Sequence, residues 1–223
     1  KALKNEFKQI YQAGQSDNVY IFAADEMARR DLNHVCLSYL MCLEEEETIA
    51  ACLAQIDKAN NMTEVLSGLT ILAHADNTAR QQALDKFYAK WKHDAQVVEK
   101  WLAIQAGADL PDALDKVITL MQHEAFSLTN PNKVRSLIGR FCAGNIIHFH
   151  AADGSGYRFL ADQVLALDSM NPQIAARLVQ NMSRWRRYDE ARQALMKQEL
   201  ERILKKEHLS KDVFEITSRS LNG

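Results

Sequence analysis

The chain contains very few residues that interrupt helices, with only 8 glycines and 3 prolines among 223 residues. A sandwich or barrel of this length would need many tight turns, and glycine and proline are the residues that usually form them. Apolar residues also recur at helical spacing in two windows, Val65, Leu66, Leu69, Leu72 and Ala73 in the first and Leu84, Phe87, Tyr88 and Trp91 in the second. Both features predict an all-α protein.

The helices are expected to stack as antiparallel pairs. The sequence indicates roughly ten to thirteen helices between Asn18 and Leu221, many in hairpins of about 35 to 40 residues, which is the spacing of an α-solenoid. One-sided apolar stripes backed by polar faces also suit stacked hairpins. No linker or change in composition divides the chain. We therefore predict an armadillo- or HEAT-like α-α superhelix that forms a single domain over residues 1–223.

Composition disfavours several classes of partner. A formal net charge of -2 provides no basic excess for nucleic acid, and no apolar run approaches the roughly 20 residues that span a bilayer. The four cysteines lie among apolar neighbours without a Cys-x-x-Cys pair, which predicts buried free thiols and a cytoplasmic location; they are Cys36, Cys42, Cys52 and Cys142. The chain begins at Lys1 without a methionine, so we expect a piece of a longer protein.

Histidine and glutamate residues do not form a zinc-peptidase motif. Such a site needs two histidines four residues apart on a helix with a glutamate beside the first. In the nearest match, His123 and Glu124 are followed by Ser127 where the second histidine should stand. His148 and His150 would point to different sides of a helix. The sequence therefore predicts no metal site in this chain.

A hydrolase triad of His150, Asp153 and Ser155 is also disfavoured. The segment around Ser155 lacks the Gly-x-Ser-x-Gly elbow and no strand precedes it. Asp153 instead suits a turn-forming cap, with Gly154 and Gly156 allowing a tight entry into the next helix. We expect no catalytic residues.

Two helix starts share one design. Asn130-Pro131 and Asn171-Pro172 each predict an Asn N-cap followed by proline at the first helical position. Arg135 and Arg177 follow early in these helices, where the helix dipole disfavours a cation. Each arginine should gain from a carboxylate partner. From the residues alone we expect an internal carboxylate and a purely structural ion pair, with a ligand carboxylate as the alternative.

The most basic patch is Arg184-Trp185-Arg186-Arg187-Tyr188. Interleaved aromatic and basic residues can bind single-stranded nucleic acid. In a weakly acidic chain, a helix face with arginines around a half-buried tryptophan is the better interpretation.

Several segments together resemble one known family. The segments occur in order over nearly the whole chain; they are Ala59–Thr63, Lys100-Trp101, Asn130–Gly139, His150 with Asp153–Tyr157, and Asn171–Gln173 leading to Arg177. This order is similar to the C-terminal domain of bacterial aminopeptidase N, a family of zinc metallopeptidases of the gluzincin type.

The resemblance implies a helper domain rather than an enzyme. In the family, a thermolysin-like domain holds one zinc ion, and the terminal superhelical domain encloses the active-site cavity, limits access and contributes arginines to its wall. Those arginines correspond to Arg135 and Arg177. The implied partners are the catalytic and other domains of the parent aminopeptidase and its peptide substrates, and the isolated chain should neither bind catalytic zinc nor cleave peptides.

Two other functions stay open from the sequence alone. The first is a free-standing helical-repeat scaffold that binds a protein partner along a concave face. The second, less favoured, is a helical repeat that binds nucleic acid.

Overall fold

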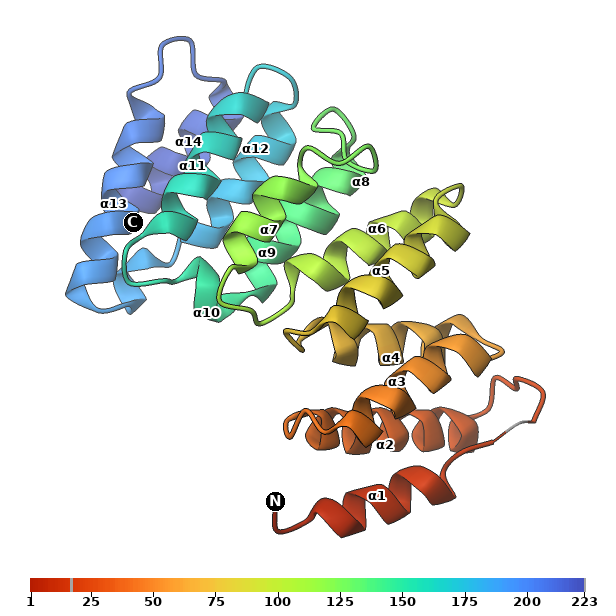
Figure 1. Ribbon diagram of the computed structural model, residues 1–223. Coiled ribbons are helices and arrows are strands. Elements are labelled where there is room, and N and C mark those ends of the chain that lie inside the picture. Colours follow the sequence, from red (N-terminus) through yellow and green to blue (C-terminus); the bar gives the residue numbers. More distant parts are fainter. Residues whose placement is uncertain (17, 223) are drawn as a thin grey trace. The chain divides into compact units, whose positions relative to one another are not determined.

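A computed structural model describes residues 1–16 and 18–222, and these residues form helices and no strands (Figure 1). The all-α prediction is therefore confirmed. Thirteen α-helices follow Asn18 in this part of the chain, in line with the expected number. None of its helices combines the length and the apolar character needed to cross a bilayer.

The chain divides into two compact units, Lys1–Trp91 and Lys92–Gly223. Each unit is described by itself below. The single domain expected over residues 1–223 stays a prediction, and positions 17 and 223 lie outside the described residues.

The first unit contains five α-helices. They are α1 Lys4–Ala13, α2 Ala24–Met41, α3 Glu46–Lys58, α4 Met62–Ala73 and α5 Thr78–Trp91. Helix α1 packs against α2, α3 packs against α4, and α4 also contacts α2 and α5. Their facing sides bury Leu37, Leu69, Leu72 and Leu84 completely. The stripes seen in the sequence thus supply the contacts between neighbouring helices, because burial of apolar surface drives such packing.

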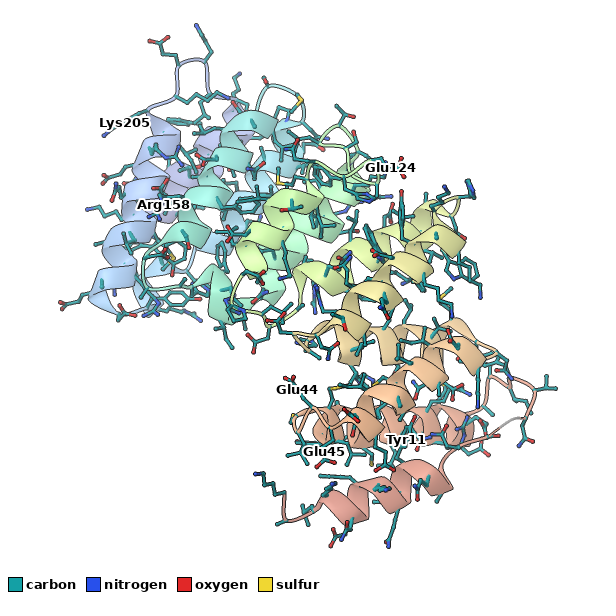
Figure 2. All side chains as sticks on the ribbon, in the orientation of Figure 1. Tyr11, Glu44, Glu45, Glu124, Arg158 and Lys205 are labelled. Atoms are coloured by element: carbon teal, nitrogen blue, oxygen red, sulfur yellow. The ribbon has the colours of Figure 1, made fainter. Side chains whose placement is uncertain are left out.

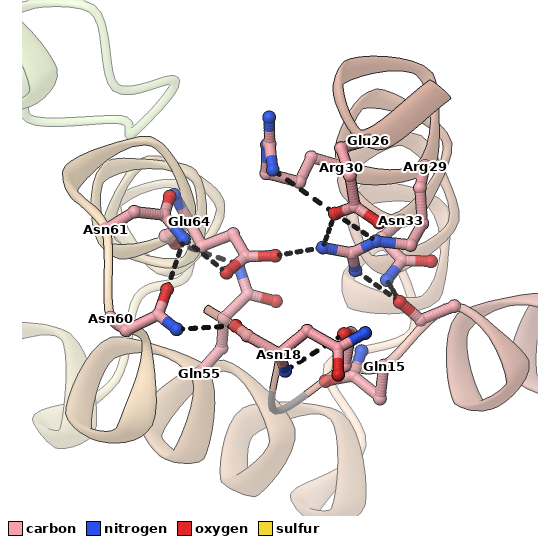
Figure 3. A network of polar contacts seen from close by, with 12 residues as sticks. Gln15, Asn18, Glu26, Arg29, Arg30, Asn33, Gln55, Asn60, Asn61 and Glu64 are labelled. Atoms are coloured by element: carbon pink, nitrogen blue, oxygen red, sulfur yellow. Dashed lines mark hydrogen bonds and ion pairs between the residues drawn. The ribbon is translucent and has the colours of Figure 1, made fainter. Parts of the chain in front are cut away.

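A polar network joins four helices of the first unit (Figure 3). Arg29 on α2 donates to Glu26 at 2.9 Å and to Glu64 on α4 at 3.3 Å, and it also donates to the carbonyl of Gly14 after α1. Gln55 on α3 donates to the carbonyl of Glu64. Asn61 caps α4 by accepting from the Glu64 amide at 3.0 Å, and its side-chain amide donates to the Glu64 carboxylate at 2.7 Å. One glutamate thereby connects three helices.

Tyr11 fixes α1 to the rest of the first unit. Its side chain, labelled in Figure 2, is buried. Its hydroxyl donates to Gln55 on α3 at 3.1 Å. Burial raises the pKa of Tyr11 to about 12. The phenol therefore stays neutral at physiological pH and keeps its hydrogen bond.

Three of the four cysteines are buried free thiols, as predicted, and Cys42 is not. Burial raises the pKa of Cys36 and Cys142, and it raises that of Cys52 to about 12. Cys42 is exposed because it lies just beyond the last turn of α2, where its thiol faces the Ser38 carbonyl. Apolar neighbours in the sequence therefore did not ensure that the Cys42 thiol, at the end of a helix, is buried.

The second unit contains the remaining helices. They are α6 Ala95–Ala106, α7 Ala113–Leu120, α8 Pro131–Val134, the π-helix η1 Arg135–Gly139, α9 Arg140–Gly144, α10 Ile146–Phe149, α11 Ser155–Leu167, α12 Pro172–Val179, the 3-10 turns η2 Gln180–Met182 and η3 Trp185–Arg187, α13 Glu190–Leu204, and α14 Lys211–Asn222. Helix α11 packs on α12 and α13, α12 packs on α14, and η1 packs on α6. These neighbouring helices again bury each other's apolar faces.

The turn before α11 is the tightest point of the second unit. Gly154 has a φ of 71°, in the left-handed region that favours glycine. A Cβ at Gly156 would lie 2.2 Å from the carbonyl oxygen of Phe149. The close approach lets Tyr157 bury its ring edge-to-face against Phe149. The two glycines predicted to allow a tight helix entry do so.

Gly156→Ala should destabilise the chain by about 2 kcal/mol or more, because the new methyl group meets backbone that cannot move without disturbing a packed core. Chemical denaturation monitored by circular dichroism measures this change. Gly139→Ala is the matched control, since a Cβ there finds only ordinary contacts, the nearest at 3.8 Å. The control should alter stability by less than about 1 kcal/mol. Equal effects of the two variants would contradict the packing described here.

Candidate functional site

One continuous helical segment, α8 with η1 and α9, carries Arg135. Asn130 caps its start, where the side-chain oxygen accepts from the amides of Asn132 at 3.0 Å and Lys133 at 3.3 Å. Proline occupies the first helical position, as predicted. Fully buried side chains hold the segment against its neighbours; they are Val134, Leu137, Ile138 and Phe141. The opposite face remains available to solvent.

The middle of this segment is a π-helix, which the sequence did not indicate. The amide of Arg140 donates to the carbonyl of Arg135, five residues earlier. Single-turn π-helices of this kind often occur at functional sites. The side chain of Arg135, at the start of the turn, is exposed, and its guanidinium donates to Asn132.

Arg177 lies on α12, whose start is built in the same way. Asn171 accepts from the Ile174 amide at 3.1 Å, and proline follows as the first helical residue. Ala176 and Leu178 are buried, whereas Arg177 is exposed. In the structure of residues 1–16 and 18–222, its guanidinium forms no hydrogen bond or ion pair.

The internal carboxylate partner considered for Arg135 and Arg177 is not found. Within the described parts of the chain, neither arginine pairs with an acidic side chain, and Arg135 is bound only by a neutral amide. The two arginines stand on separate helical segments of the same unit. Both cations are therefore available to an external anion.

His150 forms a cluster that sequence inspection missed. Its Nδ1 atom lies 2.8 Å from the hydroxyl of Tyr157, and its Nε2 atom lies 3.0 Å from the hydroxyl of Tyr188. Tyr188 also stacks on the imidazole at 4.4 Å. Arg192 donates to the His150 carbonyl at 2.9 Å. The only sequence signal was that aromatic residues flank the segment that carries His150. The three rings come from separate positions in the chain, so no local motif joins them.

Both ring nitrogens of His150 are thus occupied by tyrosine hydroxyls. Asp153 accepts from the Ser155 amide at 3.0 Å, which confirms the predicted turn. The structure gives no bond between Asp153 and His150 in the residues it describes. The triad that the sequence disfavoured is not assembled.

Burial lowers the pKa of His150 below its usual value, and the positive charge of Arg192 lowers it further. Burial raises the pKa of the neighbouring Tyr157 to about 12. A neutral imidazole can donate one hydrogen bond and accept the other. The cluster therefore holds His150 in its uncharged form.

The histidines in this unit do not suit a zinc ion. His148 Nε2 lies 2.9 Å from an oxygen of Asp109, and His123 Nδ1 accepts from the Ala125 amide. Among the residues that the structure covers, His, Cys, Asp and Glu side chains form no group of three or more that could hold a metal. These residues do not provide the ligand set that a catalytic zinc ion requires.

The basic patch is part of the packing at the end of the chain. Trp185 donates from Nε1 to the Ser220 carbonyl at 2.9 Å, and the Arg186 guanidinium stacks on its ring at 4.3 Å and donates to the same carbonyl. Two details of the prediction were wrong. Trp185 is 8% exposed rather than half-buried, and it lies on a 3-10 turn rather than on an α-helix, because its indole closes against α14.

Comparison with known proteins identifies the family. Residues 1–222 match the model of the family described as "Domain of unknown function (DUF3458_C) ARM repeats". The chain belongs to this family. The family description agrees with the predicted armadillo-like array of helix pairs, which is thereby confirmed.

Individual relatives point to one kind of enzyme. The chain is 38% identical over 221 residues to aminopeptidase N of Haemophilus influenzae, 40% identical over 202 residues to that of Caulobacter vibrioides, and 36% identical over 219 residues to that of Escherichia coli. These matches cover 99%, 90% and 98% of this chain but only 25%, 23% and 25% of the relatives. The chain therefore spans about a quarter of their length.

A solved structure agrees with these relatives. The crystal structure of Legionella pneumophila aminopeptidase A in complex with aspartic acid is similar with a TM-score of 0.89 and 33% identity. The match covers 99% of this chain and 27% of that one. The predicted resemblance to the C-terminal domain of bacterial aminopeptidase N is confirmed.

The His150 cluster should make stability depend on pH. The folded state lowers the pKa of His150, so between that pKa and the usual value of about 6.5 the unfolded chain binds more protons, and stability falls as pH falls through this window. His150→Gln should flatten this part of the curve, as measured by denaturation at pH 5 to 7. Tyr188→Phe, which keeps the imidazole, is the control and should retain the slope. An unchanged slope in His150→Gln would refute the assignment.

Proposed function

We propose that this chain is the non-catalytic C-terminal domain of a zinc aminopeptidase, and that it caps the active-site cavity of the parent enzyme. In this role it limits access to the cavity and helps to bind peptide substrates while N-terminal amino acids are removed. Its partners are the catalytic and other domains of the parent protein, and the location is cytoplasmic. The support is the close similarity to one quarter of several aminopeptidases.

Arg135 and Arg177 are proposed as the substrate-binding residues. The observation that carries this proposal is that both arginines are exposed, lie near capped helix starts and lack an acidic partner in the described structure. An unpaired guanidinium readily forms charge-assisted hydrogen bonds to a carboxylate or a peptide carbonyl. In a cavity closed from water these bonds strengthen, because the local dielectric constant falls.

The zinc ion of the parent enzyme is assigned to the part of the protein that precedes this homologous quarter. This chain supplies no ligand set for it in the described residues. Its contribution is therefore confined to binding and orienting the peptide and to excluding larger substrates. No bond-breaking step is assigned to its side chains.

Arg177→Ala in the full-length enzyme should lower kcat/KM for peptides by about tenfold to a hundredfold, because a hydrogen bond to a charged group contributes about 1.5–3 kcal/mol. Zinc content measured by atomic absorption should not change. Arg219→Ala is the matched control, since this exposed arginine on α14 pairs with Glu215. Wild-type kinetics of Arg177→Ala on peptides of several lengths would count against the proposal.

The isolated chain should not hydrolyse a fluorogenic alanine amide, with or without added zinc. The physical reason is that the described residues contain no side-chain cluster that could hold a metal ion and activate its bound water. The measurement is fluorescence release by the purified 223-residue chain, with the full-length enzyme as the positive control. Turnover that requires the metal would show that the chain is itself a catalyst.

A further inference from the structure

Exposed apolar side chains are concentrated at the start of the first unit. Ten of the fifteen large apolar side chains that are exposed in the described residues lie between Leu3 and Tyr39, and the other five are spread over the second unit. Monomeric proteins rarely expose a contiguous group of apolar side chains unless the group is an interaction surface. Helices α1 and α2 therefore carry a candidate interface.

Helix α2 is apolar on two sides. One side is buried, with Leu37 fully covered, where α2 packs on its neighbours α1 and α4. Leu32, Val35 and Tyr39 follow each other at spacings of three and four residues and are 51%, 43% and 58% exposed. Because this spacing places side chains on one side of a helix, they form a second stripe that points away from the buried one. A helix with two apolar sides is typical of a helix that is covered on both.

Helix α1 widens this apolar face. The ring of Phe7 on α1 stacks on that of Tyr39 on α2, with ring centroids 5.0 Å apart. Leu3 and Ile10, about one turn to either side of Phe7, are also exposed. A hollow of about 460 Å³ lies at the stack, and its walls include Leu3, Phe7, Tyr39 and Cys42. Two helices that pack side by side (Figure 1) with a hollow between their apolar stripes form a groove for a third helix.

The last helix of the chain, α14, has a different outer face. Most of its exposed side chains are charged; they are Lys211, Asp212, Glu215 and Arg219. Phe214 is the one large apolar side chain exposed on the described part of this helix. In stacked helical repeats a terminal repeat needs a polar outer face, whereas an internal repeat is apolar on both sides. Helix α14 has the face of a terminal helix, and the pair of α1 and α2 has that of an internal repeat.

The relatives are long enough to supply the covering helix. This chain matches 23–25% of their length and corresponds to their C-terminal domain, so most of each relative precedes the matched quarter. The family is described as ARM repeats, in which each helix pair packs on the next. A neighbour that continues the array on the side of α1 and α2 is therefore a helix.

We infer that the face formed by α1 and α2 is an interface between repeats. In the parent aminopeptidase it is covered by an amphipathic helix from the sequence directly preceding the matched quarter. That helix carries apolar residues at spacings of three and four, which fill the hollow beside Phe7 and Tyr39. The inference rests on the proposed function only in placing this chain within a larger aminopeptidase, and it does not involve the roles of Arg135 and Arg177.

Cys42 provides a direct test, because its exposed thiol lies on the wall of the hollow and the other three thiols are buried. Labelling with a maleimide, measured by mass spectrometry of the Cys42 peptide, should be at least about tenfold slower in the full-length aminopeptidase than in the isolated chain. Asp212→Cys on α14 is the matched control and should be labelled at similar rates in both proteins. Equal rates for Cys42 would overturn the inference.

Photo-crosslinking in the full-length enzyme identifies the occupant. Tyr39→p-azidophenylalanine keeps an aromatic ring of similar size at the stack. Cross-links should fall in the segment directly preceding this chain, at positions three or four residues apart. Cross-links to a second copy of the enzyme, or to its zinc-binding domain, would show that a helix of the same array does not cover this face.

Val35→Glu distinguishes a covered face from a free one. In the isolated chain Val35 is exposed, so the melting temperature should change by less than about 2 °C. In the full-length enzyme the new charge would be buried without a partner, and the melting temperature should fall by roughly 5 °C or more. Phe214→Glu is the control, with small changes expected in both proteins. Equally small changes for Val35→Glu would contradict the interface.

Failure of this inference can be told apart from failure of the proposed function. An unprotected Cys42 together with reduced peptide turnover in Arg177→Ala would overturn the interface and leave the proposed function standing. A protected Cys42 together with wild-type turnover in Arg177→Ala would support the interface and count against the substrate-binding role.

Discussion

The structure depends on burial of the single apolar face of each helix against its neighbours. Short helices such as α8 and α12 are marginal in isolation, since helix nucleation is costly and few turns are available to offset it. Asparagine caps and first-position prolines reduce that cost, and buried residues such as Leu137 and Leu178 provide the rest. The same packing fixes which side chains remain on the outer face of each helix.

Arg135 and Arg177 owe their availability to this arrangement. Other charged side chains beside the buried faces do have acidic partners, for example Arg29 with Glu26 and Glu64. A charged group held near a helix start without a carboxylate is unfavourable for the isolated chain. Such a cost is common where a side chain is kept ready for a ligand, since binding sites often depart from what stability alone would favour.

The His150 cluster shows a different use of polar groups. Two tyrosine hydroxyls satisfy both imidazole nitrogens, and the Arg192 guanidinium joins the same turn through the His150 carbonyl. The contacts connect the Asp153–Tyr157 turn to the start of α13. These bonds matter for stability because the cluster is partly buried. Loss of one partner would leave a polar atom with neither a protein partner nor water, which destabilises the fold. The cluster therefore stabilises this part of the fold.

The sequence by itself determined the helical class, the Asn-Pro caps of α8 and α12, the Asp153 turn and the absence of a zinc motif, because each depends on residues close together along the chain. Only the tertiary structure decided the π-turn at Arg135, the contact of Arg140 with Gly107 and Gly144, and the tyrosine partners of His150. The long-range contacts join residues far apart in the sequence, and the π-turn depends on one added residue in a helix. Local helix propensity predicts neither kind of feature. Packing of η1 on α6 and of α11 on α13 brings these residues together.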